Sequence, residues 1–198
     1  YLPNAETVEP DTKLGLDDMF ELVRKADEDY RTLQEKKEKL KQKIEEYRAK
    51  QQIVAPFRPL ECDLHRVLHY RYITYRFGRI AVEFYHKMQK YLMDDLKAIF
   101  VEGERDESYV YGVYFVSQAE TQKVDAVFRS LHFERIELKD EFEGTPDTAY
   151  RVLENEIARV NLEIEDLDKQ AGEMLADRAP QLVAARDRLE ELSNNFDV

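Results

Sequence analysis

The chain contains few of the residues that build disulfide frameworks, loops and membrane spans. Its 198 residues include a single cysteine (Cys62), six glycines, six prolines and no tryptophan. One cysteine excludes an internal disulfide framework and favours a cytosolic setting. So few glycines and prolines argue against a loop-rich fold, and no apolar run approaches the roughly 18 residues of a transmembrane helix.

The chain also lacks an excess of basic residues. Lys and Arg total 30 against 42 Asp and Glu, which gives a formal net charge of −12. Nucleic acid or an anionic membrane surface would need a basic face, so neither is an expected partner. Charged residues make up 36% of the chain, well above the roughly 25% of an ordinary globular domain, and this share indicates long exposed helices.

The chain begins at Tyr1 and shows no signal-peptide pattern, so we expect it to be a piece of a longer protein. Residues 1–12 contain Pro3, Pro10 and several acids, which predict a poorly ordered lead-in. The remainder divides into a first helix (13–55), a compact segment (56–143) and a returning helix (144–198).

Both long helices carry the heptad pattern of a coiled coil. In the first, apolar positions alternate in spacing between four and three residues, with one polar break at Lys37; they are Met19, Val23, Ala26, Tyr30, Leu33, Leu40, Ile44 and Tyr47. The second starts at Thr145-Pro146-Asp147, an N-cap followed by a proline and an acid that suit the first helical turn. Its seam is Leu153, Ile157, Val160, Ile164, Leu167 and Ala171, then Leu175, Leu182, Ala185, Leu189 and Leu192.

Each apolar stripe must be buried, and the nearest partner for each helix is the other. The pairing is then antiparallel, because both helices join the same compact segment. We expect Tyr30 to face Ala171–Gly172 and Lys37 to lie near Ile164. The seam of the second helix slips in phase near Gly172 and Met174, so a kink or short break is expected close to Pro180.

The segment 56–143 is rich in aromatic and β-branched residues, which favour strands. The pattern predicts the order βαββαβ, the ferredoxin-like arrangement. The expected elements are a strand Val67–Tyr75, a helix Arg79–Tyr91, strands Ala98–Glu102 and Tyr109–Val116, a helix Gln118–Leu131 and a strand Glu134–Leu138. The predicted fold class is therefore α+β: a long antiparallel two-helix coiled coil capped by a small ferredoxin-like lobe.

No residue pattern points to catalysis, a cofactor or a metal. His65 and His69 have the spacing of two ligands on a helix, but we place them at the start of a strand, where they would lie about 13 Å apart. Cys62 has no histidine beside it in a nucleophile motif, and the chain has no glycine-rich phosphate loop. We expect a non-enzymatic protein without catalytic, cofactor-binding or metal-binding residues.

Residues 65–90 are basic within an acidic chain. Ordinary surface charge explains this run, and so does a docking face for an acidic protein segment. The candidate docking residues are Arg66, Arg71, Arg76, Arg79, Lys87 and Lys90.

Several short segments, in their order, carry a resemblance to a known family: Phe77-Gly78-Arg79-Ile80, Tyr114-Phe115-Val116-Ser117, Phe133-Glu134 with Leu138, and Glu143-Gly144-Thr145-Pro146. With a heptad helix on each side of an α/β lobe, they resemble the cytoplasmic N-terminal part of V-type ATPase subunit I, the bacterial and archaeal relative of subunit a. The resemblance covers residues 14–195.

That resemblance implies a stator role on the cytoplasmic side of the membrane, within a membrane-bound complex. In the family, the distal lobe binds a peripheral stalk of subunits E and G, which holds the catalytic head still while the membrane ring turns. Proton or sodium transport belongs to a membrane domain that this sequence does not include. No functional side chain carries over to this chain.

Two other functions remain open. Small βαββαβ domains often bind amino acids, so the lobe could be a regulatory ligand-binding domain on a coiled-coil stalk, which a ligand-induced rise in melting temperature would reveal. Alternatively, the chain is a general coiled-coil adaptor that dimerises through its helices. A monomeric mass in solution would count against the adaptor.

Overall fold

The computed structural model describes the backbone of residues 5–196 and the side chains of residues 15–195. The elements are α1 (Ala5–Val54), η1 (Ala55–Phe57), α2 (Leu64–Leu68), β1 (Ile73–Ala81), α3 (Val82–Asp94), β2 (Ala98–Arg105), β3 (Tyr109–Ser117), η2 (Gln118–Glu120), α4 (Thr121–Ser130), β4 (Glu134–Arg135) and α5 (Pro146–Phe196). None of the helices in the described part of the chain combines the length and apolar character of a membrane span.

The chain forms two compact units. The first contains Tyr1–Lys43 and Arg159–Val198, and the second contains Ile44–Ala158. The α+β class predicted from the sequence is confirmed, because a pair of long helices and a small four-stranded antiparallel sheet are both present.

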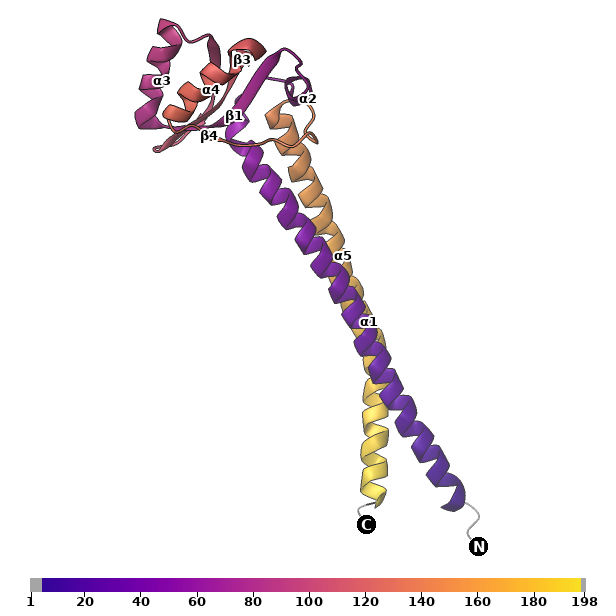
Figure 1. Ribbon diagram of the computed structural model, residues 1–198. Helices are drawn as coiled ribbons and strands as arrows, with labels where there is room; N and C mark the ends of the chain where they lie inside the picture. Colours follow the sequence, from indigo (N-terminus) through magenta and orange to yellow (C-terminus); the bar gives the residue numbers. More distant parts are fainter. Residues whose placement is uncertain (1–4, 197–198) are drawn as a thin grey trace. The chain divides into compact units, whose positions relative to one another are not determined.

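The first unit is an antiparallel pair of helices, as predicted. Asp29 of α1 forms an ion pair with Arg178 of α5, and Lys37 Nζ lies 2.8 Å from Asp168 Oδ1. The partners' residue numbers fall along α5 as they rise along α1, which fixes the antiparallel direction. Figure 1 shows these parts of α1 and α5 side by side.

The contacts across the pair include charged side chains that hydrophobic periodicity does not detect. Lys37, predicted near Ile164, reaches Asp168, which is one turn further along α5. Tyr30 was expected in the seam but is exposed, whereas its neighbour Asp29 is half-buried and pairs with Arg178.

The ends of the two helices also differ from the sequence pattern. Helix α1 begins at Ala5, so the poorly ordered lead-in expected over residues 1–12 is not found from residue 5 onward, and residues 1–4 lie outside the described part. In α5, Met174 is half-buried whereas Leu175 is exposed, so the seam keeps its phase through Met174 and Arg178, and the expected one-residue slip falls later, before Leu182. Pro180 lies inside α5, which has no break there, although Figure 1 shows the helix axis turning in this region.

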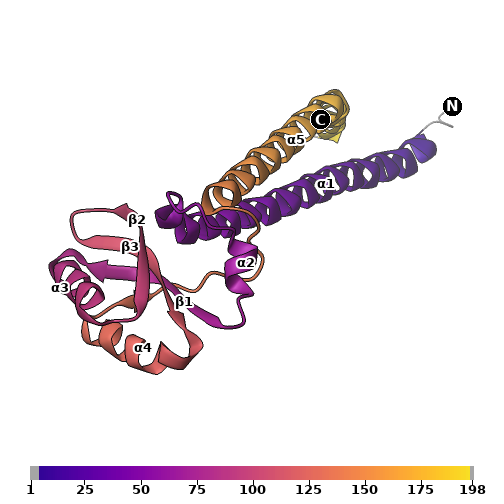
Figure 2. The ribbon, with the colours of Figure 1, turned by 90° about the horizontal axis from the view of Figure 1, so that it is seen from above.

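The second unit is built on a sheet with strand order β2-β3-β1-β4, all neighbours antiparallel. With α3 between β1 and β2 and α4 between β3 and β4, this is the ferredoxin-like arrangement that the sequence predicted. Figure 2 shows α3 and α4 beside the sheet. The predicted hairpin of β2 and β3 is confirmed, with Val101 opposite Val113.

The first strand lies later in the chain than expected. Residues 64–68 form the short helix α2, because the Asp63 side chain accepts a hydrogen bond from the Arg66 amide at 3.1 Å and caps it. Strand β1 then runs from Ile73 to Ala81, so Arg79 and Ile80 are strand residues rather than the start of a helix. The last strand is also shorter than predicted, at two residues.

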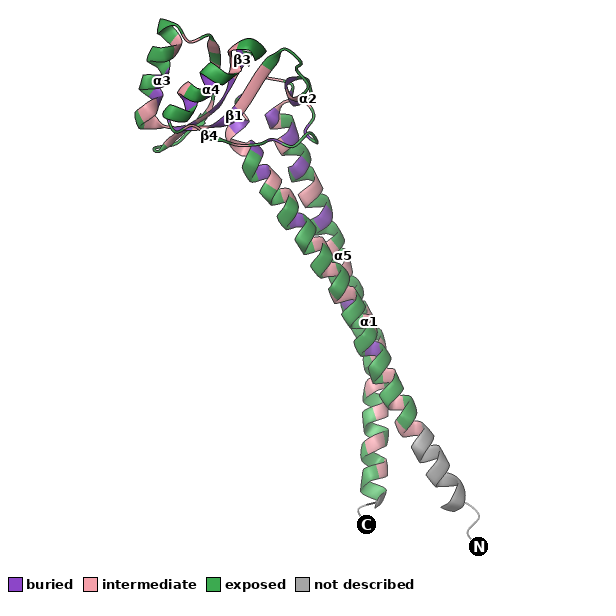
Figure 3. Ribbon diagram, viewed as in Figure 1, coloured by how far each residue is buried: buried purple, intermediate pink, exposed green. Residues whose placement is uncertain are grey.

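Each face of the sheet has its own apolar core. On one face, Tyr114 stacks on Phe128 of α4 with ring centroids 3.8 Å apart, and Met88 of α3 is buried with them. On the other face, Phe57 meets Phe77 edge-on at 5.2 Å. That second core also takes in Val54, Leu64, Val67, Val113, Ala149 and Leu153. Figure 3 marks these buried positions in purple.

The start of α5 is fixed by a side-chain cap, as the sequence predicted. Thr145 Oγ1 accepts a hydrogen bond from the Thr148 amide at 3.1 Å, and Gly144 before it has a φ of 72°. We expect Thr145→Ala to lower the free energy of unfolding by about 1 kcal/mol, because the amide loses its partner. Urea unfolding followed by circular dichroism would measure this. Thr145→Ser keeps the hydroxyl and should stay close to the parent, and an equal loss in both variants would argue against the cap.

Candidate functional site

The six basic residues predicted as a docking face do not share one surface. Arg76 and Arg79 point to opposite faces of β1. The Arg76 guanidinium lies 3.2 Å from Asp125 of α4, whereas Arg79 Nε donates to Glu134 of β4 at 2.6 Å and its guanidinium lies 3.9 Å above the Tyr109 ring. Both arginines are therefore held by partners within the chain.

The other four residues are exposed. Among the described residues, no ion pair includes Arg66, Arg71, Lys87 or Lys90. Arg66 belongs to α2, which contributes to the Phe57–Phe77 core, whereas the two lysines belong to α3, which packs on the other face of the sheet. A partner that contacted Arg66 would therefore approach a different face from one that contacted the lysines.

Two of the six predicted residues, Arg71 and Arg76, do come together in a groove of about 470 Å³. Its walls are residues 70–71, 73–77, Gln118 and 135–138. Arg135 adds a third guanidinium, which the sequence analysis missed because this residue lies outside the basic run. Arg135 reaches the groove because β4 pairs with β1, where Arg135 lies opposite Gly78. We call Arg71, Arg76 and Arg135 the arginine groove.

Two arginines of the groove, Arg76 and Arg135, meet at the carboxylate of Asp125, which is buried. One carboxylate oxygen lies 3.2 Å from both Arg76 Nη2 and Arg135 Nη2, and the other accepts a hydrogen bond from the Tyr114 hydroxyl at 2.5 Å. Burial of Asp125 favours its neutral form, but the bond from Tyr114 and the two guanidinium groups outweigh this and lower its pKa. Burial and the Asp125 carboxylate raise the pKa of Tyr114.

The arginine groove carries a net positive charge. Asp125 pairs with Arg76 and Arg135, Glu137 also lines the groove, and Arg71 adds a third guanidinium group. The Nε of Arg76 is moreover buried without a hydrogen-bond partner among the described atoms. Guanidinium groups bind carboxylates in a two-point geometry, so the arginine groove is suited to an acidic side chain or a free carboxylate.

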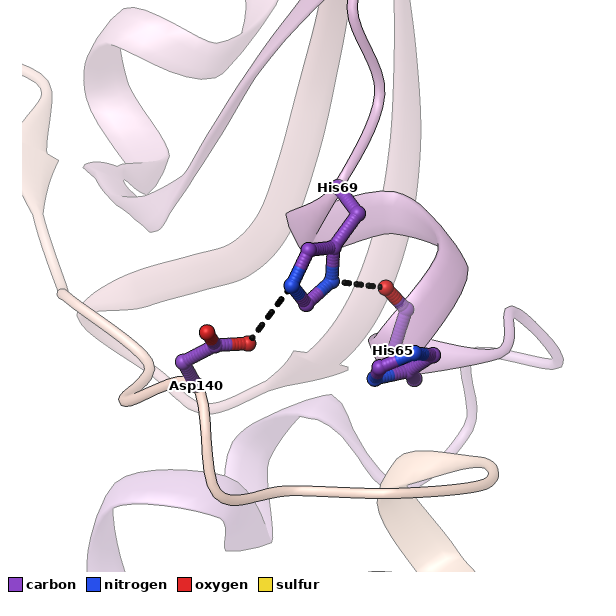
Figure 4. Close-up of side chains that lie close together, drawn as sticks. All are labelled: His65, His69 and Asp140. Carbon is purple, nitrogen blue, oxygen red and sulfur yellow. Dashed lines mark hydrogen bonds and ion pairs between the residues drawn. The ribbon is translucent and has the colours of Figure 1, made fainter.

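The histidines lie differently from the sequence-based expectation. His65 is in α2 and His69 follows its last residue, so the two rings lie one helical turn apart, with centroids separated by 4.4 Å. The expected separation of about 13 Å assumed an extended strand and is wrong. Asp140, in the connection before α5, lies beside them (Figure 4). His86 and His132 are not part of this cluster.

Cys62 is half-buried and carries no sign of activation. Desolvation raises the pKa of its thiol, so the thiol stays protonated at neutral pH and is a poor nucleophile. Two groups of described side chains are suited to binding: an arginine groove with an excess of positive charge, and a separate cluster of two imidazoles and a carboxylate.

No protein-family model matches the chain, and no curated protein matches it. The structure is similar to a crystal structure of the cytoplasmic N-terminal domain of subunit I, the homolog of subunit a, of V-ATPase, with a TM-score of 0.52 and 12% sequence identity. The match covers 84% of this chain and 56% of that one, so the chain spans little more than half the length of that domain. At this identity the likeness shows that the two proteins share a fold.

Proposed function

We propose that the chain is a non-catalytic stator segment of a rotary V-type ATPase. In this role it would lie on the cytoplasmic side of the membrane and link the membrane sector to the peripheral-stalk subunits E and G. The observation that supports the proposal is the shared fold with the V-ATPase subunit I domain over 84% of the chain. That fold combines an antiparallel helical pair with a ferredoxin-like sheet.

The helical pair has the properties that a stator needs. Helix α1 has 50 residues, which corresponds to about 75 Å at the usual rise. Small side chains, Ala26 and Ala171, are buried in the seam, and two ion pairs connect α1 to α5. Two long helices in contact resist bending more than one, so such a pair can hold a distance under load.

The sheet unit offers the surface for a partner, and the arginine groove is our candidate. A segment that docks there should be acidic, because the three arginines of the groove outnumber its two carboxylates, Asp125 and Glu137. The chain as a whole has a net charge of −12, so it repels an acidic partner at most other places on its surface. This contrast favours docking of an acidic segment at the arginine groove.

A calorimetric titration with the purified E–G stalk heterodimer from the same source tests the stator proposal. We expect saturable one-to-one binding that weakens as salt rises, because charges on an exposed surface are screened. The absence of heat at tens of micromolar, at low and moderate salt, would contradict the proposed partner.

A charge reversal in the arginine groove then tests the docking surface. Arg71 is exposed and takes part in no ion pair among the described residues, so Arg71→Glu leaves the fold intact. We expect it to weaken stalk binding about 3- to 10-fold, because an exposed attraction between Arg71 and an acidic partner is replaced by repulsion between two negative charges. Lys87→Glu, on α3 and outside the residues that line the groove, makes the same charge change and should have little effect. Equal weakening by both variants would indicate a general charge effect and count against the arginine groove.

A second function is supported by one observation, the presence of three arginines in a groove of ligand-binding size. The sheet unit could bind a small carboxylate and regulate the parent protein. Thermal unfolding with and without aspartate or glutamate separates the two proposals. A concentration-dependent rise in melting temperature that Arg71→Glu abolishes would favour the regulatory lobe.

A further inference from the structure

His65, His69 and Asp140 bring three metal-binding side chains together at one exposed place in the second unit. Their potential ligand atoms all lie within 4.8 Å of one another. His65 and His69 come from α2 and its end, and Asp140 comes from the connection between β4 and α5 (Figure 4). The stator proposal does not use any of these residues.

The orientation of His69 is fixed by a backbone contact. Its Nδ1 lies 2.6 Å from the carbonyl oxygen of His65. A carbonyl oxygen only accepts hydrogen bonds, so Nδ1 carries a proton. In the neutral ring, Nε2 is therefore the atom with the free lone pair. A bond from the second ring nitrogen to a backbone carbonyl is the usual way in which metal-binding histidines are oriented.

The lone pair of Nε2 faces a carboxylate. Asp140 Oδ1 lies 3.3 Å from His69 Nε2. Two electron-rich atoms repel each other at this distance unless a positive charge lies between them, which can be a proton on Nε2 or a metal ion. Figure 4 shows the carboxylate and the ring facing each other across this short gap.

The distance between these two atoms suits a metal ion. In a tetrahedral zinc site with Zn–N and Zn–O bonds of about 2.0–2.1 Å, two ligand atoms lie about 3.3–3.4 Å apart. The separation in the structure is 3.3 Å, so an ion can bind both atoms without moving the backbone. The His65 ring, tilted by 44° from the His69 ring, is exposed and can turn to become the third ligand.

We propose that His65, His69 and Asp140 form a binding site for a divalent transition-metal ion such as Zn²⁺, with water as the fourth ligand. Two imidazoles and one carboxylate favour zinc, cobalt, nickel or copper over magnesium and calcium, which prefer oxygen ligands. The ion connects α2 to the segment that leads into α5. The hydrogen bond from the Leu64 amide to the Gly144 carbonyl, at 2.8 Å, and the core shared by Val67 and Phe142 already join these two segments, so metal binding adds to an existing junction.

Calorimetric titration of the full chain, without a polyhistidine tag, with ZnCl₂ tests the site. We expect one Zn²⁺ per chain with a dissociation constant in the micromolar range. His69→Ala should weaken binding at least tenfold, since even partners that only orient a metal ligand are worth about 10- to 100-fold. His65→Ala and Asp140→Asn should also weaken it, and MgCl₂ should give no saturable heat. All three side chains are exposed, so these variants should fold, which circular dichroism checks.

His86→Ala is the matched control, because His86 is exposed on α3 and outside the cluster. Its zinc affinity should equal that of the parent, and in histidine-ring NMR spectra only the resonances of His65 and His69 should shift with zinc. Unchanged zinc affinity in His69→Ala would overturn the proposal, since the ion would then be bound by Cys62 or by surface acids. The absence of stoichiometric binding by the parent chain would overturn it as well.

Discussion

Asp125→Ala should lower the free energy of unfolding by about 2–4 kcal/mol, because it removes the acceptor shared by the buried Tyr114, the half-buried Arg76 and the exposed Arg135. Without the carboxylate, the Tyr114 hydroxyl loses its 2.5 Å bond in the core, and Arg76 and Arg135 lose their common partner. Asp125 itself is 9% exposed, so water does not replace the lost bonds. Chemical unfolding followed by tyrosine fluorescence measures the effect.

Asp94→Ala is the matched control for this change. Asp94 is exposed at the end of α3, where an acid is unfavourable to the helix dipole, so its removal should be neutral or slightly stabilising. If Asp125→Ala cost no more than this control, the cluster around Asp125 would have no role in stability.

The same carboxyl should make stability depend on pH. The folded-state pKa of Asp125 is lowered, so its contribution is full above the unfolded value of about 3.9 and is lost as pH falls through the folded value. Asp125→Asn cannot titrate, so its stability should fall less steeply below about pH 4. Urea unfolding of both chains at neutral and acidic pH tests this, and parallel pH profiles would contradict it.

Gly78→Ala should be comparably damaging, with a loss of about 3 kcal/mol, because β1 and β4 leave no space for a side chain at this position. A Cβ on Gly78 would lie 2.2 Å from the backbone oxygen of Glu134 and 2.5 Å from the Phe133 ring. The ring could turn, but the oxygen belongs to the strand paired with β1. The clash is therefore relieved only if β4 moves away from β1.

Hydrogen exchange locates the damage predicted for Gly78→Ala. The Ile136 amide donates to the Phe77 carbonyl at 2.8 Å, so it should exchange faster once β4 has moved, while amides of the β2–β3 hairpin keep more of their protection. Gly172→Ala in α5 makes the same chemical change with nothing within 4 Å of the new methyl. It should stabilise its helix by about 0.5–1 kcal/mol. Full protection at Ile136 in Gly78→Ala would show that the steric argument is wrong.

Periodicity predicted the parts of the fold in which one physical requirement dominates. The seam positions from Leu33 to Tyr47 in α1 and from Leu153 to Ala171 in α5 are buried or half-buried as predicted, since apolar burial decides them. The β2–β3 hairpin was also placed correctly, although Ile99 and Val101 of β2 are exposed. The first strand was misplaced because Val67 and Leu68 have residue types common in strands, whereas the Asp63 cap makes them helical. The same mistake hid the His65–His69 pair, because the expected separation depends on the conformation of the backbone.

The candidate docking surface was predicted only in part, for a geometric reason. A run of basic residues in the sequence does not distinguish the two faces of a sheet, so Arg76 and Arg79 were grouped although they point in opposite directions. Arg135 is distant in sequence and becomes a neighbour of Arg76 only through the pairing of β4 with β1. Local patterns contain no information on such pairings.

The ion pair between Asp29 and Arg178 has a consequence for how the helical pair responds to force. An apolar heptad seam permits sliding by seven residues, since every heptad presents similar side chains to its partner. Sliding here would separate Asp29 from Arg178, and Lys37 from Asp168, and would place charges against apolar neighbours. The charged contacts thus specify a single alignment. A pull along the helix axis would have to bury these charges without their partners, which costs free energy, so the two helices move together.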